Sequence, residues 1–161
     1  MLRAFWPGSA RRNREGSEPG SCEPDPIALR RNQTVTATAE DIIRRYVDAT
    51  SAANEDGAAA LTAEDAVIEL PNGAVLEGKE GARQFAAKHA ETDGQKRSVA
   101  LASLDARTQN RFVAALVMTN REVATDELLY SMDVGAVFEV RDGLIARNQV
   151  FPSPDEAAAA V

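Results

Sequence analysis

The sequence contains very few of the residues that most metal and redox sites need. Among its 161 residues there is one cysteine, Cys22, and one histidine, His89. A single cysteine cannot form an internal disulfide, and this pair alone cannot build a Cys/His zinc cluster. No Asp-rich segment has the spacing of a calcium-binding loop. We therefore expect neither a metal nor a cofactor.

Long hydrophobic runs are also missing. No apolar run approaches the roughly 18 residues that cross a bilayer, and no apolar segment of secretory-signal length follows the basic start. We therefore expect a cytoplasmic protein without membrane contact. The net charge is −7, with 25 acidic against 18 basic residues. Because an acidic body repels phosphate groups, nucleic acid is not an expected partner.

The chain does contain enough apolar sequence for one folded domain. Hydrophobic residues make up 44% and charged residues 27%, which is typical of a globular protein. Residues 1–36 are rich in Gly, Ser, Pro and Arg without a hydrophobic period, which predicts a disordered N-terminal extension. A short interaction segment around Phe5 and Trp6 is the alternative. Residues 37–152 are the predicted domain, and residues 153–161 are a flexible or short helical tail.

Three helices are predicted in the first half of the domain. Thr38 to Asp41 has the form of a capping box, and one helix face follows at Ile43, Tyr46, Val47 and Thr50. We expect Asp56-Gly57 to break this helix before a short alanine-rich one that runs to about Leu61. A third helix is predicted from Gly78 to about Ala90, and its apolar face is Ala82, Phe85, Ala86 and His89.

Strands dominate the remainder. Residues 66–70 and 74–77 flank the turn signal Asn72-Gly73, and four more strands are predicted at residues 98–106, 112–123, 128–140 and 144–151. Their short connections require antiparallel pairing. Helices followed by a long meander are typical of an α+β domain with helices on one face of a curved sheet.

The strand at residues 128–140 has two different faces. Tyr130, Met132, Val134 and Phe138 share a wholly apolar or aromatic face, which we expect to face the helices. Asp133 lies on the other, mixed face, together with Ser131 and Val137. Without a bulge in the strand it points away from the interior, as a rim or interface acid.

Three segments carry a resemblance to a known family: AEDAVIELPNGAVLEGKEGARQF, MDVGAVFEVRDGLIARNQVF and, less sharply, IIRRYVDATSAANEDG. With the order of elements, they resemble the nuclear transport factor 2-like superfamily, and within it the SnoaL-like relatives of polyketide cyclases and ketosteroid isomerases. The resemblance implies a cone-shaped curved antiparallel sheet wrapped around a long helix, the cystatin-like α+β barrel. It also implies a pocket at one end and a homodimer through the outer sheet face.

Two catalytic residues that the resemblance implies are replaced. Isomerase relatives carry a general-base Asp just before the Pro that ends the first strand, where this chain has Leu70. The isomerases and the cyclases place another acid on the meander strand, where this chain has Ala136. Neither substitute can transfer a proton. Tyr46 matches the position of the isomerases' hydrogen-bond-donating tyrosine.

The inward-facing polar residues supply the remaining site candidates. His89 is the candidate acid/base, because an unperturbed imidazole titrates at about pH 6.5. Its candidate partner is Tyr46 or Glu122, whichever the fold brings within hydrogen-bond reach, and Tyr46 is the second candidate catalytic residue. The candidate ligand-binding residues are Tyr130, Asn148, Met132, Phe85 and Glu122.

Two functions therefore remain open from the sequence. One is an enzyme of the isomerase or cyclase type that acts on a small hydrophobic, polyketide- or steroid-like molecule. The other is a non-catalytic ligand-binding or dimeric scaffold domain.

Overall fold

The chain enters its first helix through the predicted capping box. The Asp41 backbone N–H donates to Thr38 Oγ1 at 3.2 Å, and the Thr38 backbone N–H donates to the Asp41 carboxylate at 3.1 Å. These bonds satisfy two of the free groups at a helix start, so α1 (Ala39–Ser51) has a defined beginning. The computed structural model describes residues 37–161. The predicted extension at residues 1–36, with Phe5 and Trp6, lies outside the described residues.

Two shorter helices follow before the long strands. α2 is Glu55–Ala60 and α3 is Gly78–Ala87. The break between α1 and α2 lies at residues 52–54, where Ala53 takes a φ of 53°. The predicted break at Asp56-Gly57 is wrong: the Gly57 N–H donates to Asn54 Oδ1 at 2.9 Å, so Asn54 caps α2 and both residues lie inside it.

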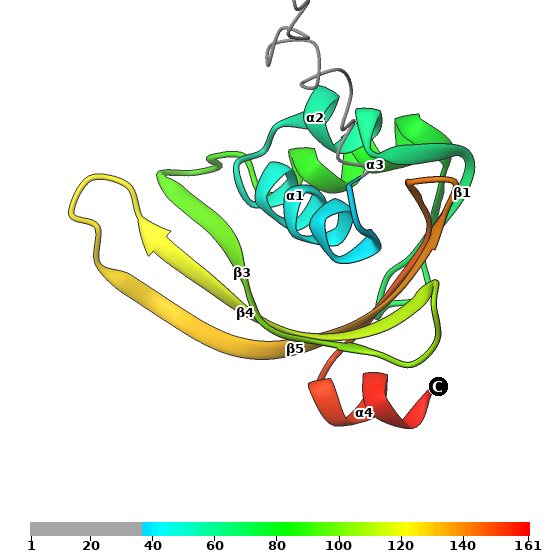
Figure 1. Ribbon diagram of the computed structural model, residues 1–161. Coiled ribbons are helices and arrows are strands. Elements are labelled where there is room, and N and C mark those ends of the chain that lie inside the picture. Colours follow the sequence, from blue (N-terminus) through cyan, green and yellow to red (C-terminus); the bar gives the residue numbers. More distant parts are fainter. Residues whose placement is uncertain (1–36) are drawn as a thin grey trace, which may run out of the picture. The chain divides into compact units, whose positions relative to one another are not determined.

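Six strands form one sheet, and Figure 1 shows that this sheet is curved. They are β1 (Thr62–Glu69), β2 (Val75–Glu77), β3 (Gln95–Ala106), β4 (Arg111–Glu122), β5 (Leu128–Arg141) and β6 (Leu144–Phe151). Their spatial order is β2-β1-β6-β5-β4-β3, so β2 and β3 are edges and the sheet is not closed. All pairs are antiparallel except β1 with β6, which run parallel. The predicted α+β class with a curved antiparallel sheet is confirmed.

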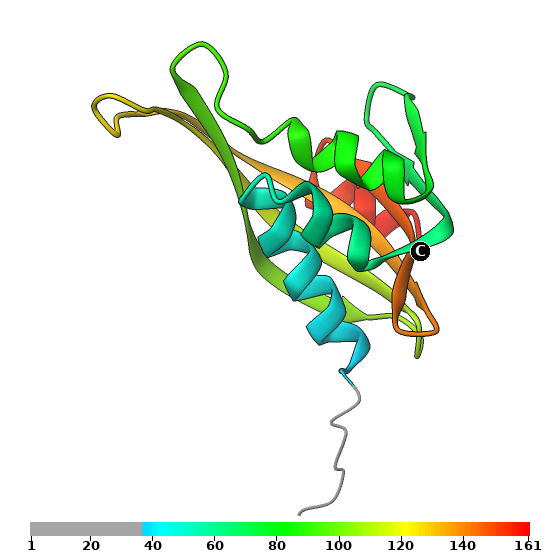
Figure 2. The same cartoon turned by 90° about the horizontal axis from the view of Figure 1, so that it is seen from above.

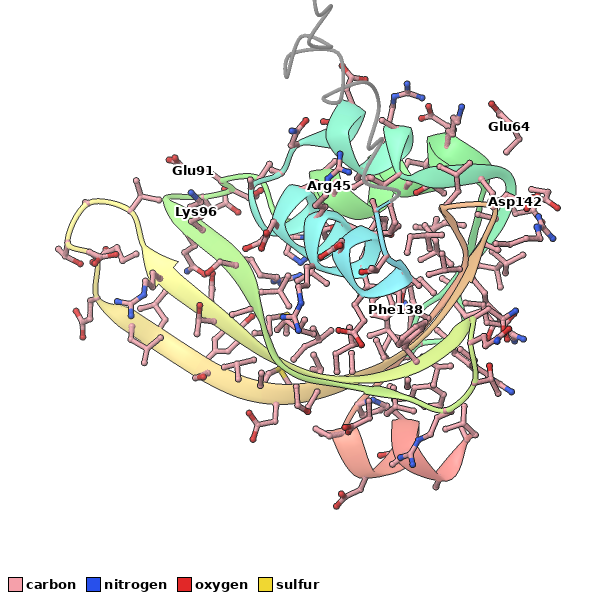
Figure 3. All side chains as sticks on the ribbon, in the orientation of Figure 1. Arg45, Glu64, Glu91, Lys96, Phe138 and Asp142 are labelled. Carbon is pink, nitrogen blue, oxygen red and sulfur yellow. The ribbon has the colours of Figure 1, made fainter. Side chains whose placement is uncertain are left out.

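The concave face of the sheet holds the main core. α1 and α3 lie across this face (Figure 2), and α1 buries Ile43, Tyr46 and Val47 against it. Phe138 of β5 lies beneath α1 (Figure 3) and meets the Tyr46 ring edge-on, with 6.0 Å between ring centroids. Burial of these large side chains is the main source of stability for the domain.

The convex face is covered over part of its area by a fourth helix, α4 (Pro154–Ala159). Ala157 packs there against Val113 and Val137, with Phe151 at the edge of the cluster. β5 passes beneath the helix at Gly135, where a Cβ atom would collide with the Ser153 carbonyl oxygen and the Ala157 Cβ. Only glycine allows this close approach. Within residues 37–161, none of the helices combines the length and the apolar character that crossing a bilayer requires.

Candidate functional site

A cavity lies between the helices and the concave face of the sheet. Its volume is about 440 Å³, within the roughly 300–1,000 Å³ typical of small-molecule sites. Its walls come from α1, the end of α3, the β1–β2 turn and strands β3 to β6. Most of the lining is apolar and includes Val47, Phe85, Val99, Leu116, Val134 and Phe138.

Three buried polar side chains meet in this lining. Tyr46 and Thr50 lie one turn apart on α1, Asn148 comes from β6, and none is more than 2% exposed. Asn148 Nδ2 donates to Tyr46 Oη at 3.5 Å. Among residues 37–161, Asn148 Oδ1 and Thr50 Oγ1 find no hydrogen-bond partner. Since an unpaired buried polar atom costs about 1–3 kcal/mol, a ligand that pairs with these atoms gains affinity.

The Tyr46 hydroxyl is a donor at any physiological pH. Burial raises the pKa of Tyr46 to about 12, although the Asn148 and Thr50 side chains act in the opposite direction. Thr50 Oγ1 therefore lies near enough to Tyr46 to affect its pKa, but the two groups do not form a hydrogen bond of standard geometry. The phenol therefore remains protonated, and its O–H is available to a carbonyl or hydroxyl oxygen.

His89 follows the end of α3 and is 6% exposed. Its Nδ1 lies 3.3 Å from the Phe85 carbonyl oxygen. Burial lowers the pKa of His89, the hydrogen bond to Phe85 opposes this, and the positive charge of Arg97 lowers the pKa further. The imidazole is therefore neutral at pH 7. A neutral ring that donates from Nδ1 to Phe85 leaves Nε2 as an acceptor.

The charged residues of the lining are both cationic. They are Lys88, which is exposed, and Arg97, which is half-buried. Within the described part of the chain, residues 37–161, no aspartate or glutamate lines the cavity: Leu70 does, and Ala136 is fully buried in the core. Among residues 37–161, no three His, Cys, Asp or Glu side chains gather where they could hold a metal ion.

Five of the seven predicted site residues line this cavity: Tyr46, Phe85, His89, Met132 and Asn148. The other two do not. Tyr130 is 40% exposed on the N-terminal half of β5. Glu122 lines a second hollow of about 320 Å³ near the β4–β5 hairpin, where its carboxylate accepts from Thr125 Oγ1. Ligand binding by these seven residues stays a prediction.

Thr50 and Arg97 are lining residues that the sequence reasoning missed. The helical spacing predicts Thr50 on the buried face of α1 but does not single it out from the apolar residues there. Arg97 alternates with Val99 and Leu101, which pack against the core. That period of two signals an inward Arg97, but the predicted strand begins only at Ser98, whereas β3 begins at Gln95.

Comparison with known proteins finds one matching protein family and many solved structures of similar fold. The family model of the SnoaL-like domain matches residues 43–148. No curated protein sequence gives a significant match.

Three solved structures illustrate the structural likeness. A candidate polyketide cyclase from Xanthomonas campestris is 25% identical, with a TM-score of 0.56, and the match covers 75% of this chain and 94% of that one. Another, from a Silicibacter species, is 26% identical with a TM-score of 0.56 over 76% and 94% of the two chains. A protein with a ketosteroid isomerase-like fold from Catenulispora acidiphila, in complex with trimethylamine, is 17% identical with a TM-score of 0.57, and the match covers 70% of this chain and 85% of that one.

Proposed function

Because the chain belongs to the SnoaL-like domain family, we propose that it binds a small, largely hydrophobic molecule of polyketide or steroid type in the cavity beneath α1. One observation carries the proposal: a mostly apolar cavity of about 440 Å³ contains open hydrogen-bonding atoms on Thr50 and Asn148, beside the protonated Tyr46. An apolar wall with a few convergent polar groups is the usual composition of a small-molecule site.

The polar groups favour a ligand with an oxygen at one end. Tyr46 Oη can donate to a ligand carbonyl, and Thr50 Oγ1 can donate or accept. The Asn148 amide faces Tyr46 with one end only, so its other end stays open whichever way round the amide is placed. A ketone or hydroxyl in contact with these atoms satisfies them, while the ring system of the ligand lies against the apolar wall.

Native mass spectrometry of the purified protein, followed by denaturing extraction, tests this proposal. We expect a discrete hydrophobic molecule in a fraction of the protein, and a loss of it in Thr50→Val, which removes one open hydroxyl. Thr119→Val is the matched control, because Thr119 bonds to Ser98 and does not line the cavity. Retention of the molecule by Thr50→Val and loss in Thr119→Val would contradict this binding mode.

Proton transfer of the isomerase or cyclase type is a second candidate. The neutral His89 favours it, because Nε2 is free to act as a base while Tyr46 donates to the substrate oxygen. With a turned-over substrate, His89→Gln is expected to lower kcat about 10²- to 10⁴-fold without unfolding the protein. If the unchanged protein and His89→Gln bind the ligand equally and neither turns it over, the chain is a non-catalytic binding domain.

The proposal extends to a homodimer in the cytoplasm. Exposed apolar side chains, Leu128, Leu129, Tyr130 and Met132, gather on the N-terminal half of β5. α4 covers Val113 and Val137, so a partner would have to contact the exposed N-terminal half of β5, which includes Leu129. Sedimentation of Leu129→Glu against the unchanged protein tests the dimer, and a monomer in both would contradict it; cell fractionation tests the location.

A further inference from the structure

Arg97 lines the cavity and has no anionic partner within residues 37–161. Its Nε is buried and has no hydrogen-bond partner among the described residues. Seven ion pairs join side chains within residues 37–161, and neither Arg97 nor Lys88 takes part in any of them. A guanidinium that is partly removed from water without an anion is costly. In a chain with 25 acidic residues, this lack of a partner needs a physical explanation.

The strand register shows why no nearby acid neutralises Arg97. Its direct neighbour on β4 is Asn120, whose Nδ2 donates to Gln95 Oε1 at 2.6 Å. The diagonal neighbour on the same face is Glu122, and that carboxylate is held by Thr125 at the β4–β5 hairpin. In Figure 3 the acids Glu64 and Asp142 lie at the opposite end of the molecule from Lys96, which precedes Arg97, whereas Glu91 lies near Lys96. Glu91 is exposed, and within residues 37–161 no ion pair joins it to Arg97.

We propose that the ligand of this cavity is an organic acid, with an anionic group that pairs with the Arg97 guanidinium and an apolar body that lies along Phe85 and Val99. This inference rests on the proposed function and adds the charge of the ligand to it. A guanidinium offers two parallel N–H donors to a carboxylate or sulfonate, which lysine does not. Lys88, exposed in the same lining, adds attraction for an anion.

The arrangement also orients the ligand. Tyr46, Thr50 and Asn148 are nearly fully buried, whereas Arg97 is half-buried and Lys88 is exposed. The neutral hydrogen-bonding groups are therefore deep, and the cations lie nearer to solvent. An acid with a neutral oxygen at its other end can satisfy both sets at once. Burial and, to a smaller extent, the positive charge of Arg97 lower the pKa of His89, so the neutral ring does not compete for the anion.

Two fluorescent probes of the same skeleton test the charge separately from the cavity. Anilinonaphthalene sulfonate is anionic, and phenylnaphthylamine lacks the sulfonate. We expect both to bind and to displace one another. We expect Arg97→Met to weaken the sulfonate about 10- to 100-fold and to leave the neutral probe within about twofold.

The matched control is Lys96→Met, which removes the same charge from the adjacent exposed residue, outside the lining. It should change neither affinity. Arg97→Lys should recover part of the sulfonate affinity, because the charge remains while the fork is lost. If Arg97→Met does not fold, Arg97→Gln replaces it with the same expectation.

Each contrary result has its own meaning. An unchanged sulfonate affinity in Arg97→Met, or an equal loss for both probes, would overturn the anion proposal and leave the cavity standing. Equal losses of sulfonate affinity in Lys96→Met and Arg97→Met would mean that only the net charge of the protein matters, which would also overturn the anion proposal. Failure of both probes to bind the unchanged protein would overturn the proposed function, and the anion proposal with it.

Discussion

The two halves of β5 differ completely in burial. Every residue from Leu128 to Asp133 is exposed, whereas from Val134 to Val140 only Glu139 is not buried. Figure 1 shows the reason: α1 and α4 lie on opposite sides of the sheet over its C-terminal half, and the β4–β5 hairpin projects beyond both. One strand therefore has a half that is covered on both faces and a half that is largely exposed, from which Met132 still reaches the cavity lining.

This difference shows that the face of the sheet to which a side chain points does not determine whether it is buried. Tyr130 shares the apolar face of β5 with Phe138, yet Tyr130 is 40% exposed and Phe138 is 1% exposed. Val137 lies on the mixed face with Asp133, yet α4 covers it to 1% exposure. Alternation assigns a side of the sheet, and only the tertiary arrangement decides whether anything lies there.

The largest loss of stability is expected for Phe138→Ala in the buried half of β5, in contrast to Tyr130→Ala on the same face of the exposed half. Phe138→Ala is expected to lower the free energy of unfolding by about 3–5 kcal/mol, because it removes the ring that packs on Tyr46 and leaves a cavity. Tyr130→Ala should cost less than about 1 kcal/mol, since Tyr130 is 40% exposed and belongs to neither hydrophobic cluster. Urea denaturation followed by circular dichroism measures both. Equal losses would mean that the exposed half is covered in solution.

A smaller effect is expected on the convex face at Gly135. Gly135→Ala places a methyl group against Ser153 and Ala157, so we expect α4 to shift and the free energy of unfolding to fall by about 1–3 kcal/mol. Faster hydrogen exchange at α4 should accompany the loss. A chain truncated after Phe151 lacks α4. In that chain, Gly135→Ala should not lower the free energy of unfolding further. An undiminished cost there would place the strain elsewhere.

Burial also sets the ionisation of the one histidine. The pKa of His89 is lowered in the folded protein, so below its ordinary value of about 6.5 the unfolded chain takes up the proton first. The free energy of unfolding should therefore fall as the pH falls from about 6.5 to about 5, before most carboxylates titrate. His89→Gln should remove this slope. The same slope in the variant would assign it to other groups.

Much of the fold follows from local signals in the sequence. The capping box at Thr38 appears where it is predicted, because its bonds join residues three apart. Asp142-Gly143 forms the predicted turn with φ values of 54° and 73°, which both residues tolerate. The parallel pairing of β1 with β6 has no such signal, because it joins residues more than 70 positions apart through backbone groups that every residue carries.

The site is harder to predict from the sequence than the fold, because it too depends on contacts between residues far apart in the chain. Helical spacing places Tyr46 and His89 inward, and both line the cavity. The same reasoning nominates Tyr130 and Glu122, which point along correct faces but lie where β4 and β5 have left the core. The open atoms of Thr50 and Asn148 depend on contacts between α1 and β6, almost a hundred residues apart. No periodicity within either segment reports such a contact.

The smallest effect is expected at Asp133, the acid in the exposed half of β5. It is exposed, lies opposite Val117 on β4, and makes no hydrogen bond or ion pair within the described residues. Asp133→Asn should therefore change the free energy of unfolding by less than about 0.5 kcal/mol and leave the binding of both naphthalene probes unchanged.

Glu139→Gln is the matched substitution in the covered half of β5. Glu139 forms an ion pair with Arg111 at 3.5 Å, and we expect its loss to lower the free energy of unfolding by at most about 1 kcal/mol. Repeating the Asp133→Asn measurement at several protein concentrations gives it a further use. A change that grows with concentration would mean that a second copy of the chain covers this half, and the contrast between the two halves of β5 would then belong to the monomer alone.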